Sequence, residues 1–391
     1  MANSVELQQF YQRSRDFYSR HSRPISSSTT LEALVQAKRV HEDDAYKYIK
    51  STRIIVHPAA QDIALRYLAY VKVNGTKTQK RVYDQLDWSC ERFLVRLIEK
   101  RPLAFLGASD TTLLRNGKYL GSATREWDRV GSDHESDDIA MEDYLTYEEM
   151  MISSLIGVSG YTPYLNDGSR RNKGIMDTRQ QPEGIQIGLV GARFEREGKM
   201  DSLYYTDEPS FFRSIFHGDT FEERYKARMR ITIDTLLMEA ETRGMEAQRN
   251  VHLYVVGLGL GVWRVHPDQQ RWFLEVFAKA LPDLRIKHIE ILEFAYIDAE
   301  LPTRKQVYDA ANYSKTQCIF SKRNPSEKLA DPSLLLVTSY AWDGNSYPGN
   351  EFYLGMLTAS GDPAAACSTA ISETHNPEIN TEMLRSIKYL K

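Results

Sequence analysis

The spacing of hydrophobic residues predicts helices over about the first hundred positions. Within residues 80–100, for example, Val82, Leu86, Phe93 and Leu97 recur at helical intervals. Serine and threonine residues stand before an earlier helical pattern, where they can cap its first turn. We therefore expect a helical N-terminal module, whose amphipathic faces are more typical of packing against a core than of binding a partner.

Beyond this module the pattern is mixed. Residues 107–143 are polar and rich in carboxylates, and residues 147–174 read as a short helix followed by a loop. Thr220 and Glu223 have the spacing of a capping box before a helix of about twenty residues. We expect the sheet to lie in the part of the chain that follows residue 174.

Four stretches have the apolar, β-branched composition of strands: residues 184–194, 251–256, 286–297 and 334–337. A helical pattern separates the second from the third, and a connection of about 35 residues leads to the fourth. This order predicts an α/β fold, a sheet flanked by helices, with ligands bound at the carboxyl ends of its strands.

Composition narrows the class of protein. Of the 391 residues, 42% are hydrophobic and 26% are charged, with a formal net charge of −3. These values are typical of a globular protein and give no support to a nucleic-acid partner. No apolar run is long enough to span a membrane, and three cysteines cannot form a fully paired disulfide framework. We expect a cytoplasmic protein with no membrane association.

The first candidate binding segment is the glycine-rich stretch after the strand at 251–256. Gly257, Gly259 and Gly261 precede a helical pattern that begins near residue 268. Glycines let the backbone approach a phosphate, and amide groups at a turn or helix N-terminus favour an anion. The spacing matches neither a dinucleotide-binding fingerprint nor a P-loop. A plain strand-to-helix turn is the alternative.

The second candidate segment follows the last predicted strand, over residues 340–353. Two carboxylates, Asp343 and Glu351, lie among Asn345, Gly349 and Asn350. A buried strand that leads into such a loop presents polar groups on a rigid support. The alternative is a pair of β-turns, because Asp-Gly-Asn and Pro-Gly-Asn both favour turns.

If both segments lie at the same edge of the sheet, they suit a ligand with a pyrophosphate and a sugar, such as ADP-ribose. One offers amide groups for the phosphates, and the other offers carboxylates that activate water or stabilise an oxocarbenium ion. Nearby aromatic residues, Trp263 and Trp342 among them, are candidates for the pocket wall, although each is individually more typical of a core. No metal site is expected, because no histidine or cysteine spacing fits one.

The two segments together resemble the ligand loops of macrodomains, and most closely those of the MavL-type, arginine-specific ADP-ribosylhydrolases. The resemblance covers residues 105–391 and implies a macrodomain-like mixed sheet, with residues 1–104 as the helical N-terminal module. It further implies an ADP-ribosylated protein substrate, with ubiquitin as a candidate, ADP-ribose as ligand and product, and no cofactor.

Carried over by motif, the resemblance implies a role for each residue of the two segments. Asp343 and Glu351 would be the catalytic carboxylates. The ligand-binding residues would be Gly257, Gly259, Gly261, Val262, Trp263, Trp342, Asn345, Gly349 and Asn350. The order of the two loops is reversed relative to an ordinary macrodomain, so which carboxylate acts as acid or base stays open.

Two other functions fit the same residues. The protein could be an ADP-ribose reader without turnover, whose loops would look alike in the sequence. It could also be a scaffold that acts through its helical module and its acidic segment at 128–143. Turnover of a modified protein separates the hydrolase from the reader, and binding of ADP-ribose separates both from the scaffold.

Overall fold

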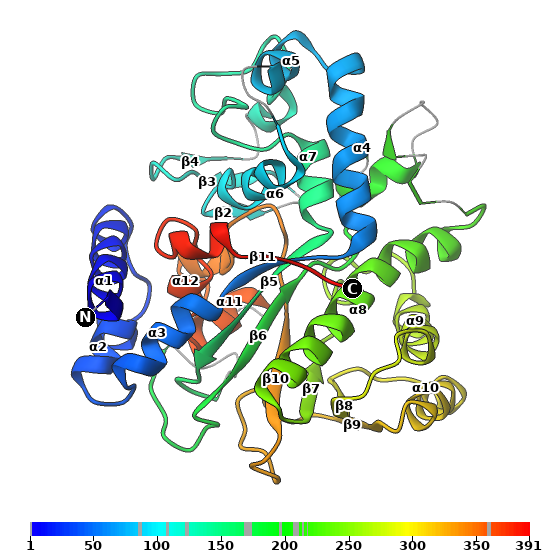
Figure 1. Ribbon diagram of the computed structural model, residues 1–391. Helices are drawn as coiled ribbons and strands as arrows, with labels where there is room; N and C mark the ends of the chain where they lie inside the picture. The colour runs from blue at the N-terminus through cyan, green and yellow to red at the C-terminus, as the bar shows by residue number, and fades with distance from the viewer. Residues whose placement is uncertain are drawn as a thin grey trace.

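An eight-stranded mixed sheet crosses the middle of the molecule (Figure 1). The computed structural model describes residues 2–84, 88–106, 109–121, 125–167, 174–194, 198–205, 211–212, 215–216, 218–357 and 361–391. In spatial order the strands are β11 (Ile387–Tyr389), β1 (Arg53–Val56), β5 (Ile156–Pro163), β6 (Glu183–Leu189), β10 (Leu335–Ala341), β7 (Val251–Val255), β8 (Ile289–Ala295) and β9 (Gln317–Ser321).

The strands that carry the candidate site are parallel to one another. β10 pairs with β6 on one side and with β7 on the other, and β7, β8 and β9 continue in the same direction. β5 is antiparallel to both β6 and β1. The mixed α/β sheet predicted from the sequence is confirmed, and helices cover it on both faces.

The alternation of side chains along β1 shows the two layers. Ile54 and Val56 pack in one hydrophobic core and Ile55 in the other. The first core is bounded by α1 (Ala2–Arg20), α2 (Leu31–Gln36), α3 (Glu42–Ser51), α11 (Asp362–Ser368) and α12 (Ile371–Thr374). The second is covered by α8 (Phe221–Ala247), α9 (Gln269–Asp283) and α10 (Leu301–Tyr313).

A further group of elements lies beyond the end of the sheet at which β6, β10 and β7 terminate (Figure 1). It comprises α4 (Pro58–Asn74), α5 (Lys77–Asp84), α6 (Cys90–Glu99), α7 (Tyr147–Ser153) and a small antiparallel sheet of β2 (Ala104–Leu106), β3 (Thr111–Leu113) and β4 (Tyr119–Leu120). These elements pack against the loop that leaves β10: Phe105 of β2 bonds to Asn350, and Ser153 of α7 donates to the carbonyl of Gly344 at 2.6 Å.

Three expectations from the sequence need correction. The loop expected within 147–174 begins with β5, a buried central strand of the sheet. The long connection before β10 contains α10 and β9. The polar stretch that begins at residue 107 includes β3 and β4. For β5 and β9, pairing with strands that are distant in the chain sets the conformation, which local periodicity does not report. β3 and β4 pair locally with each other and with β2, and they are only three and two residues long.

The first hundred residues are mostly helical, as predicted, but they also supply β1, which lies between β11 and β5. The chain before residue 105 therefore contributes to the same sheet as the chain after it. The division at residue 104 stays a prediction.

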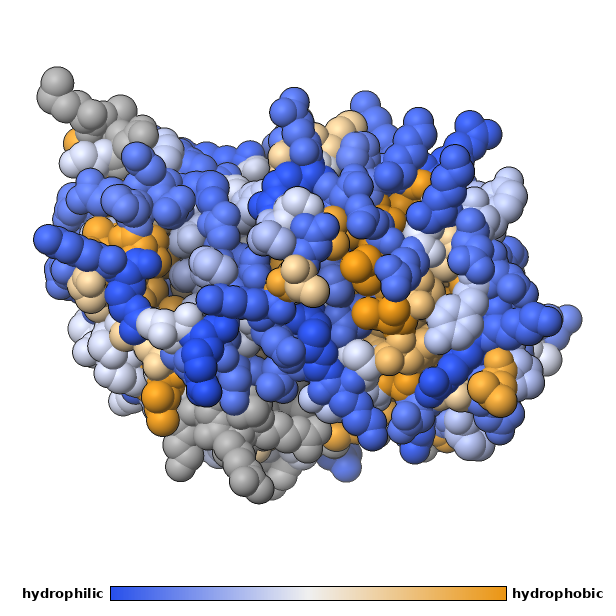
Figure 2. Space-filling model, turned by 90° about the horizontal axis from the view of Figure 1, so that it is seen from below, coloured by the Kyte–Doolittle hydropathy of each residue, from blue (hydrophilic) through white to orange (hydrophobic). Residues whose placement is uncertain are grey.

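The molecule is largely hydrophilic on the face seen from below, where hydrophobic side chains form several separate areas (Figure 2). Within the described part of the chain, no helix combines the length and the apolar character needed to cross a membrane.

Helix α8 begins with the predicted capping box. The Thr220 hydroxyl accepts the Glu223 N–H at 3.2 Å, and the Glu223 carboxylate accepts the Thr220 N–H at 3.0 Å. Farther along α8, Glu239 is buried between two arginines, Arg53 of β1 and Arg243, at 2.9 and 2.7 Å. This ion-pair cluster joins α8 to strand β1 of the sheet.

Removing the charge of Glu239 should strongly destabilise the protein, because two buried guanidinium groups would lose their shared partner. We expect Glu239→Gln to lower the free energy of unfolding by about 3–5 kcal/mol, as measured by denaturant unfolding. Glu246 also binds Arg53, at 2.9 Å, but its side chain is 39% exposed. Glu246→Gln should cost no more than about 1 kcal/mol; equal losses for the two variants would contradict this assignment.

Candidate functional site

The two segments singled out from the sequence emerge at the same edge of the sheet. β7 and β10 are parallel neighbours. The glycine turn (residues 257–263), which follows β7, and the acidic loop (residues 343–351), which follows β10, therefore leave the sheet side by side. The chain after Leu189 of β6 leaves at this edge as well. This arrangement confirms the expected juxtaposition of the two segments.

The glycine turn packs closely against the chain that leaves β6. A Cβ atom on Gly191 would lie 2.3 Å from the backbone nitrogen of Gly259, and one on Gly259 would lie 3.0 Å from the carbonyl oxygen of Ala192. Gly259 also has a φ of +73°. Only glycine fits this backbone-to-backbone contact, which fixes the position of the turn.

The outer part of the turn is open. A Cβ atom on Gly261 would meet nothing within 4 Å, and Val262 is 86% exposed. Gly257 is half-buried and its carbonyl accepts the N–H of Leu260. Trp263 is half-buried and packs against the core that contains the acidic loop. Gly261 and Val262 therefore offer accessible backbone, whereas Gly257 and Gly259 shape the turn.

Helix α9 begins at Gln269, within a residue of the predicted position, but seven residues separate it from Gly261. The Gln269 side chain accepts the backbone N–H groups of Val265 and His266, at 2.6 and 2.7 Å. The chain between the turn and the helix is thus held by the helix itself. The exposed backbone at Gly261 and the helix N-terminus are separate features.

Asp343 holds the acidic loop together through its own carboxylate. One carboxylate oxygen accepts the N–H groups of Asn345 and Ser346, at 2.8 and 3.0 Å, and the Ser346 hydroxyl contacts both oxygens. Burial raises the pKa of Asp343, while these hydrogen bonds and the charge of Arg193 act in the opposite direction.

Arg193, which the sequence analysis missed, fastens this loop to the rest of the molecule. Its guanidinium donates to the main-chain carbonyl of Asp343 at 2.6 Å, to the side-chain oxygen of Asn345, and to the carbonyl of Met150 at 3.2 Å. The side-chain oxygen of Asn345 is thereby engaged inside the protein. The backbone N–H of Arg193 donates to the buried carboxylate of Asp201.

Asp201 continues the network into α8. Arg228 donates to Asp201 at 3.0 Å and to the carbonyl of Ser154 at 3.1 Å. Asp201, Arg193 and Arg228 are all fully buried. The acidic loop is therefore connected to α7 and α8 by charged hydrogen bonds that are shielded from water.

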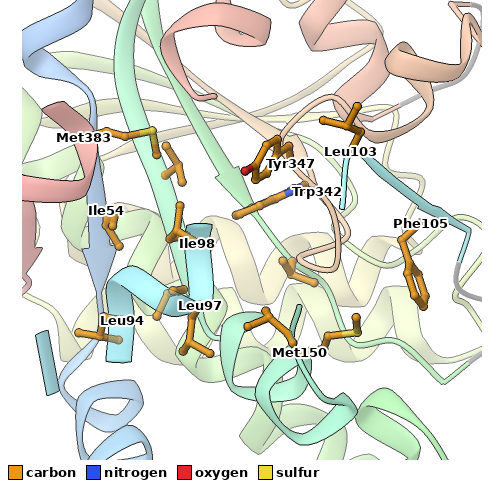
Figure 3. Packing of buried hydrophobic residues seen from close by; sticks show 14 of the residues in the cluster. Ile54, Leu94, Leu97, Ile98, Leu103, Phe105, Met150, Trp342, Tyr347 and Met383 are labelled. Carbon is orange, nitrogen blue, oxygen red and sulfur yellow. The ribbon is translucent and has the colours of Figure 1, made fainter. Parts of the chain in front are cut away.

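Trp342 lies inside the protein and not on a pocket wall. Its side chain is fully buried, and its indole N–H donates to the Ser346 carbonyl at 3.1 Å. Figure 3 shows Trp342 and Tyr347 packed among hydrophobic side chains that include Leu103 and Met150. Trp342 therefore packs beneath the acidic loop.

Asn350 is likewise engaged within the fold. Its side-chain oxygen accepts the Phe105 N–H at 2.9 Å, and its side-chain nitrogen donates to the Phe105 carbonyl at 3.3 Å. The amide thereby pairs with β2 as another strand would. Gly349, with a φ of +116°, precedes it and donates its N–H to Asp362 at 3.0 Å.

Asp362 is a third carboxylate of the site and was not predicted. It is the first residue of α11 and is buried. Burial raises the pKa of Asp362 well above its ordinary value, and the charges of Glu351 and Asp343 raise it further. The sequence signal was Gly361-Asp362-Pro363, a helix start eleven residues after Glu351.

Glu351 is the partly exposed member of this carboxylate cluster, defined as Asp343, Glu351 and Asp362. It lies on the short 3-10 helix Asn350–Leu354. Within the described residues, no three His, Cys, Asp or Glu side chains are placed to hold a metal ion. The cluster lies in the chain that leaves β10, and the neighbouring strand β7 leads into the glycine turn. At least one carboxyl of the cluster, that of Asp362, has a raised pKa, which favours its protonated form.

Comparison with known proteins gives a family match over most of the chain. A family model described as ADP-ribosylhydrolase MavL-like matches residues 8–205 and 202–389. The chain belongs to the MavL-like ADP-ribosylhydrolase family. It is accordingly a hydrolase that acts on ADP-ribosyl groups. The match begins at residue 8, so the family likeness includes the first hundred residues, contrary to the range expected from the sequence motifs.

Two curated relatives come from Drosophila melanogaster. The chain is 30% identical to ADP-ribosylarginine hydrolase CG2909 over 405 residues, which cover 88% of this chain and 78% of the relative. It is also 30% identical to ADP-ribosylarginine hydrolase CG3568 over 432 residues, which cover 92% and 83%. The likeness thus extends over most of each protein.

The contact between Gly259 and the chain after β6 predicts a difference between two glycines of one turn. Gly259→Ala should lower the free energy of unfolding by at least about 1–3 kcal/mol, because its φ is positive and the atoms in the way belong to backbone. Gly261→Ala, which meets nothing, should stay within about 0.5 kcal/mol of the wild type. Denaturant unfolding of both variants measures this difference; equal stabilities would contradict the described turn.

Proposed function

We propose that the protein removes ADP-ribose from modified arginine side chains of other proteins by hydrolysing the N-glycosidic bond. The observation that carries the proposal is the carboxylate cluster beside the open glycine turn. The names of the two fly relatives, both ADP-ribosylarginine hydrolases, support the arginine linkage.

In this proposal ADP-ribose lies across the ends of β7 and β10, as in macrodomains, which the sequence motifs resemble. The pyrophosphate contacts the accessible backbone at Gly261 and Val262, where no side chain stands in the way. The distal ribose then reaches the acidic loop, since that loop is the neighbour of the glycine turn. The modified arginine extends beyond the ribose, over the carboxylate cluster.

An anionic cluster suits this substrate because a glycosylated guanidinium carries a positive charge. Carboxylates that face it bind the cation and stabilise positive charge that develops on the sugar. A serine-linked or glutamate-linked ADP-ribose has no such cation. The excess of carboxylates over neutral amides at the site thus favours the arginine linkage.

The reaction is a displacement by water. The water oxygen forms a bond to the anomeric carbon of the distal ribose while the bond from that carbon to the guanidinium nitrogen breaks. The electron pair of the broken bond leaves with the nitrogen. A carboxylate takes a proton from the water and returns it to the guanidine, so that arginine and free ADP-ribose are the products.

The burial of the three carboxyls suggests a division of roles. Glu351 is partly exposed and is our candidate for the group that contacts water and the reacting carbon. Asp343 holds the loop through its hydrogen bonds. The raised pKa of Asp362 favours its protonated form, and we assign this carboxyl as a hydrogen-bond donor to a ribose hydroxyl. Their closeness keeps one of them neutral while the others carry charge.

The protein carrying the modification is not defined by the site. Ubiquitin is our candidate, on the basis of the resemblance to MavL-type enzymes noted in the sequence. We also place the protein in the cytoplasm, an assignment supported by Cys90, Cys318 and Cys367, which are all free thiols.

The decisive measurement is release of ADP-ribose from arginine-, serine- and glutamate-linked ADP-ribosyl proteins assayed in parallel. We expect release from the arginine linkage, and a loss of roughly 10²–10⁴-fold in Glu351→Gln. Asp343→Asn should lose less, because its amide oxygen still accepts the loop N–H groups. Release from the serine linkage alone would refute the proposal, whereas binding of ADP-ribose without any release would indicate a reader.

The raised pKa of Asp362 predicts how activity depends on pH. A carboxyl with a raised pKa stays protonated to a higher pH, so activity that needs the proton is present at low pH and is lost as pH rises through that pKa. Asp362→Asn is permanently neutral and should remove this alkaline decline from the pH profile of kcat. An unchanged decline in the variant would assign it to another group.

A further inference from the structure

Asn350 stands directly before Glu351, and its side chain is paired with a distant part of the chain. The side-chain oxygen accepts the Phe105 N–H at 2.9 Å, and the side-chain nitrogen donates to the Phe105 carbonyl at 3.3 Å. Because one partner is a donor and the other an acceptor, the amide fits in one orientation only. Asn350 is 4% exposed. The group that the sequence resemblance assigned to ligand binding is therefore already paired inside the protein.

Phe105 gives this pairing a firm support. Its own side chain is buried, and its ring lies edge-to-face with Trp127, with the ring centres 5.1 Å apart. The Trp127 indole N–H donates in turn to the Leu145 carbonyl at 3.2 Å. Strand β2, which contains Phe105, also pairs with β3. The backbone groups that hold Asn350 thus belong to a strand that is anchored on two sides.

The segment that leads to Phe105 holds the acidic loop at a second residue, Tyr347. The carbonyl of Pro102 accepts the Tyr347 N–H at 2.9 Å, and the carbonyl of Glu99 accepts the Tyr347 hydroxyl at 3.1 Å. The last part of the acidic loop is therefore held at two points by one short stretch of chain, and Asn350 is the later of the two.

Arg101 of the same stretch supports the chain just before the acidic loop. It is fully buried, and its guanidinium carbon lies 4.1 Å from the centre of the Trp342 ring. The guanidinium donates to the Leu97 carbonyl at 2.6 Å. Arg101 thus packs against the residue that precedes the loop, whereas Asn350 holds the end of the loop that carries Glu351.

The helical turn that carries Glu351 depends on such outside contacts. It is a 3-10 helix of five residues, Asn350–Leu354, and 3-10 helices have poorer hydrogen-bond geometry than α-helices. The two residues that lead into Glu351, Gly349 and Asn350, have φ values of +116° and +26°. A positive φ is uncommon for a residue other than glycine and persists where the surroundings hold it. The pairing with Phe105 supplies that restraint.

Gly349 is held from another direction. Its N–H donates to the carboxylate of Asp362, the first residue of α11, at 3.0 Å. Two adjacent residues are thus tied to two different elements, Gly349 to α11 and Asn350 to β2. Together these bonds fix the course of the backbone immediately before Glu351.

We propose that Asn350 is a positioning residue, which holds Glu351 in place through its pairing with Phe105 and does not bind the ribose. The inference rests on the proposed function, because it takes Glu351 as the group that contacts the reacting carbon. A firm hold matters for that role, since a displacement of about 1 Å can lower the rate of a reaction about 10²-fold. Binding of ADP-ribose at the glycine turn needs no such alignment of Glu351.

The test separates turnover from binding in Asn350→Gly. Glycine removes the amide and adopts a positive φ without strain, so the change is confined to the pairing with Phe105. With an arginine-linked substrate, kcat should fall about 10²-fold, while the dissociation constant of ADP-ribose, measured by calorimetry, stays within about twofold of the wild type. Loss of a hydrogen bond to the ribose would instead raise that dissociation constant about tenfold, which would overturn the proposal, as would a wild-type kcat.

Asn350→Gln provides a second variant, which also serves if Asn350→Gly does not fold. It retains the amide on a side chain that is longer by one methylene group, so pairing with Phe105 shifts the backbone before Glu351. We expect the same division, with a lower kcat and an unchanged dissociation constant of ADP-ribose. A wild-type kcat in this variant would contradict a positioning role.

Asn380→Ala is the matched control, because Asn380 is also a buried asparagine that binds main-chain groups. Its side-chain nitrogen donates to the carbonyls of Ile49 and Thr374, at 3.0 and 2.8 Å. This variant should lose stability while its kcat and its affinity for ADP-ribose match those of the wild type. Equal losses of kcat in Asn380→Ala and Asn350→Gly would assign the effect to general stability and refute the positioning role.

Hydrogen exchange of the Phe105 amide tests the pairing without turnover. In Asn350→Gly this N–H loses its acceptor and should exchange about tenfold faster than in the wild type. An unchanged rate would overturn the proposal. A wild type that releases no ADP-ribose from any linkage, with the exchange altered as expected in the variant, would refute the proposed function and leave the pairing of Asn350 with Phe105 established.

Discussion

The structure around the site depends on keeping negative charge buried at one edge of a parallel sheet. Asp343 and Asp362 are removed from water, and Glu351 is close enough to act on Asp362. Carboxylates in such surroundings protonate unless cations or hydrogen-bond donors compensate them. Arg193 and Arg101 supply positive charge from the buried side. In the function that we propose, the guanidinium of the modified arginine would supply it from the open side.

The sheet explains how a few loops can meet this constraint. β10 lies between β6 and β7, so the chain after each of these strands reaches the same edge. Arg193 comes from the β6 exit, the glycine turn from the β7 exit and the carboxylates from the β10 exit. The contact of Gly191 with Gly259 sets the spacing between two of these exits. Parallel pairing therefore positions both the charges and the accessible backbone.

The sequence predicted the parts of this site that carry a local signal. The strand before Gly257, the capping box at Thr220 and the turn residues around Asp343 each follow from neighbours in the chain. Arg193 and Asp362 could not be found in this way. Arg193 bonds to the carbonyl of Asp343, 150 residues away, and Asp362 interacts with the charge of Asp343, 19 residues away. The local sequence pattern does not show that these residues lie near Asp343 in the folded protein.

Long-range pairing also gives some residues contacts that the sequence did not indicate. Trp342 and Asn350 have the composition of a binding loop, but their partners, Arg101 and Phe105, belong to a segment almost 250 residues earlier. β5 and β9 were missed because their conformation comes from strand neighbours that are distant in the chain. The acidic loop therefore has a buried side, where Trp342 and Asn350 lie, and a partly exposed side, which carries Glu351.

The contacts on the buried side of the acidic loop show how the first hundred residues contribute to the structure. Glu99, Arg101 and Pro102 contact the buried side of the loop, and β1 completes the sheet beneath it. The family match, which begins at residue 8, covers these elements together with the acidic loop. An independent helical module would leave the loop without the cation beneath Trp342. The N-terminal region accordingly supports the buried side of the acidic loop through these contacts.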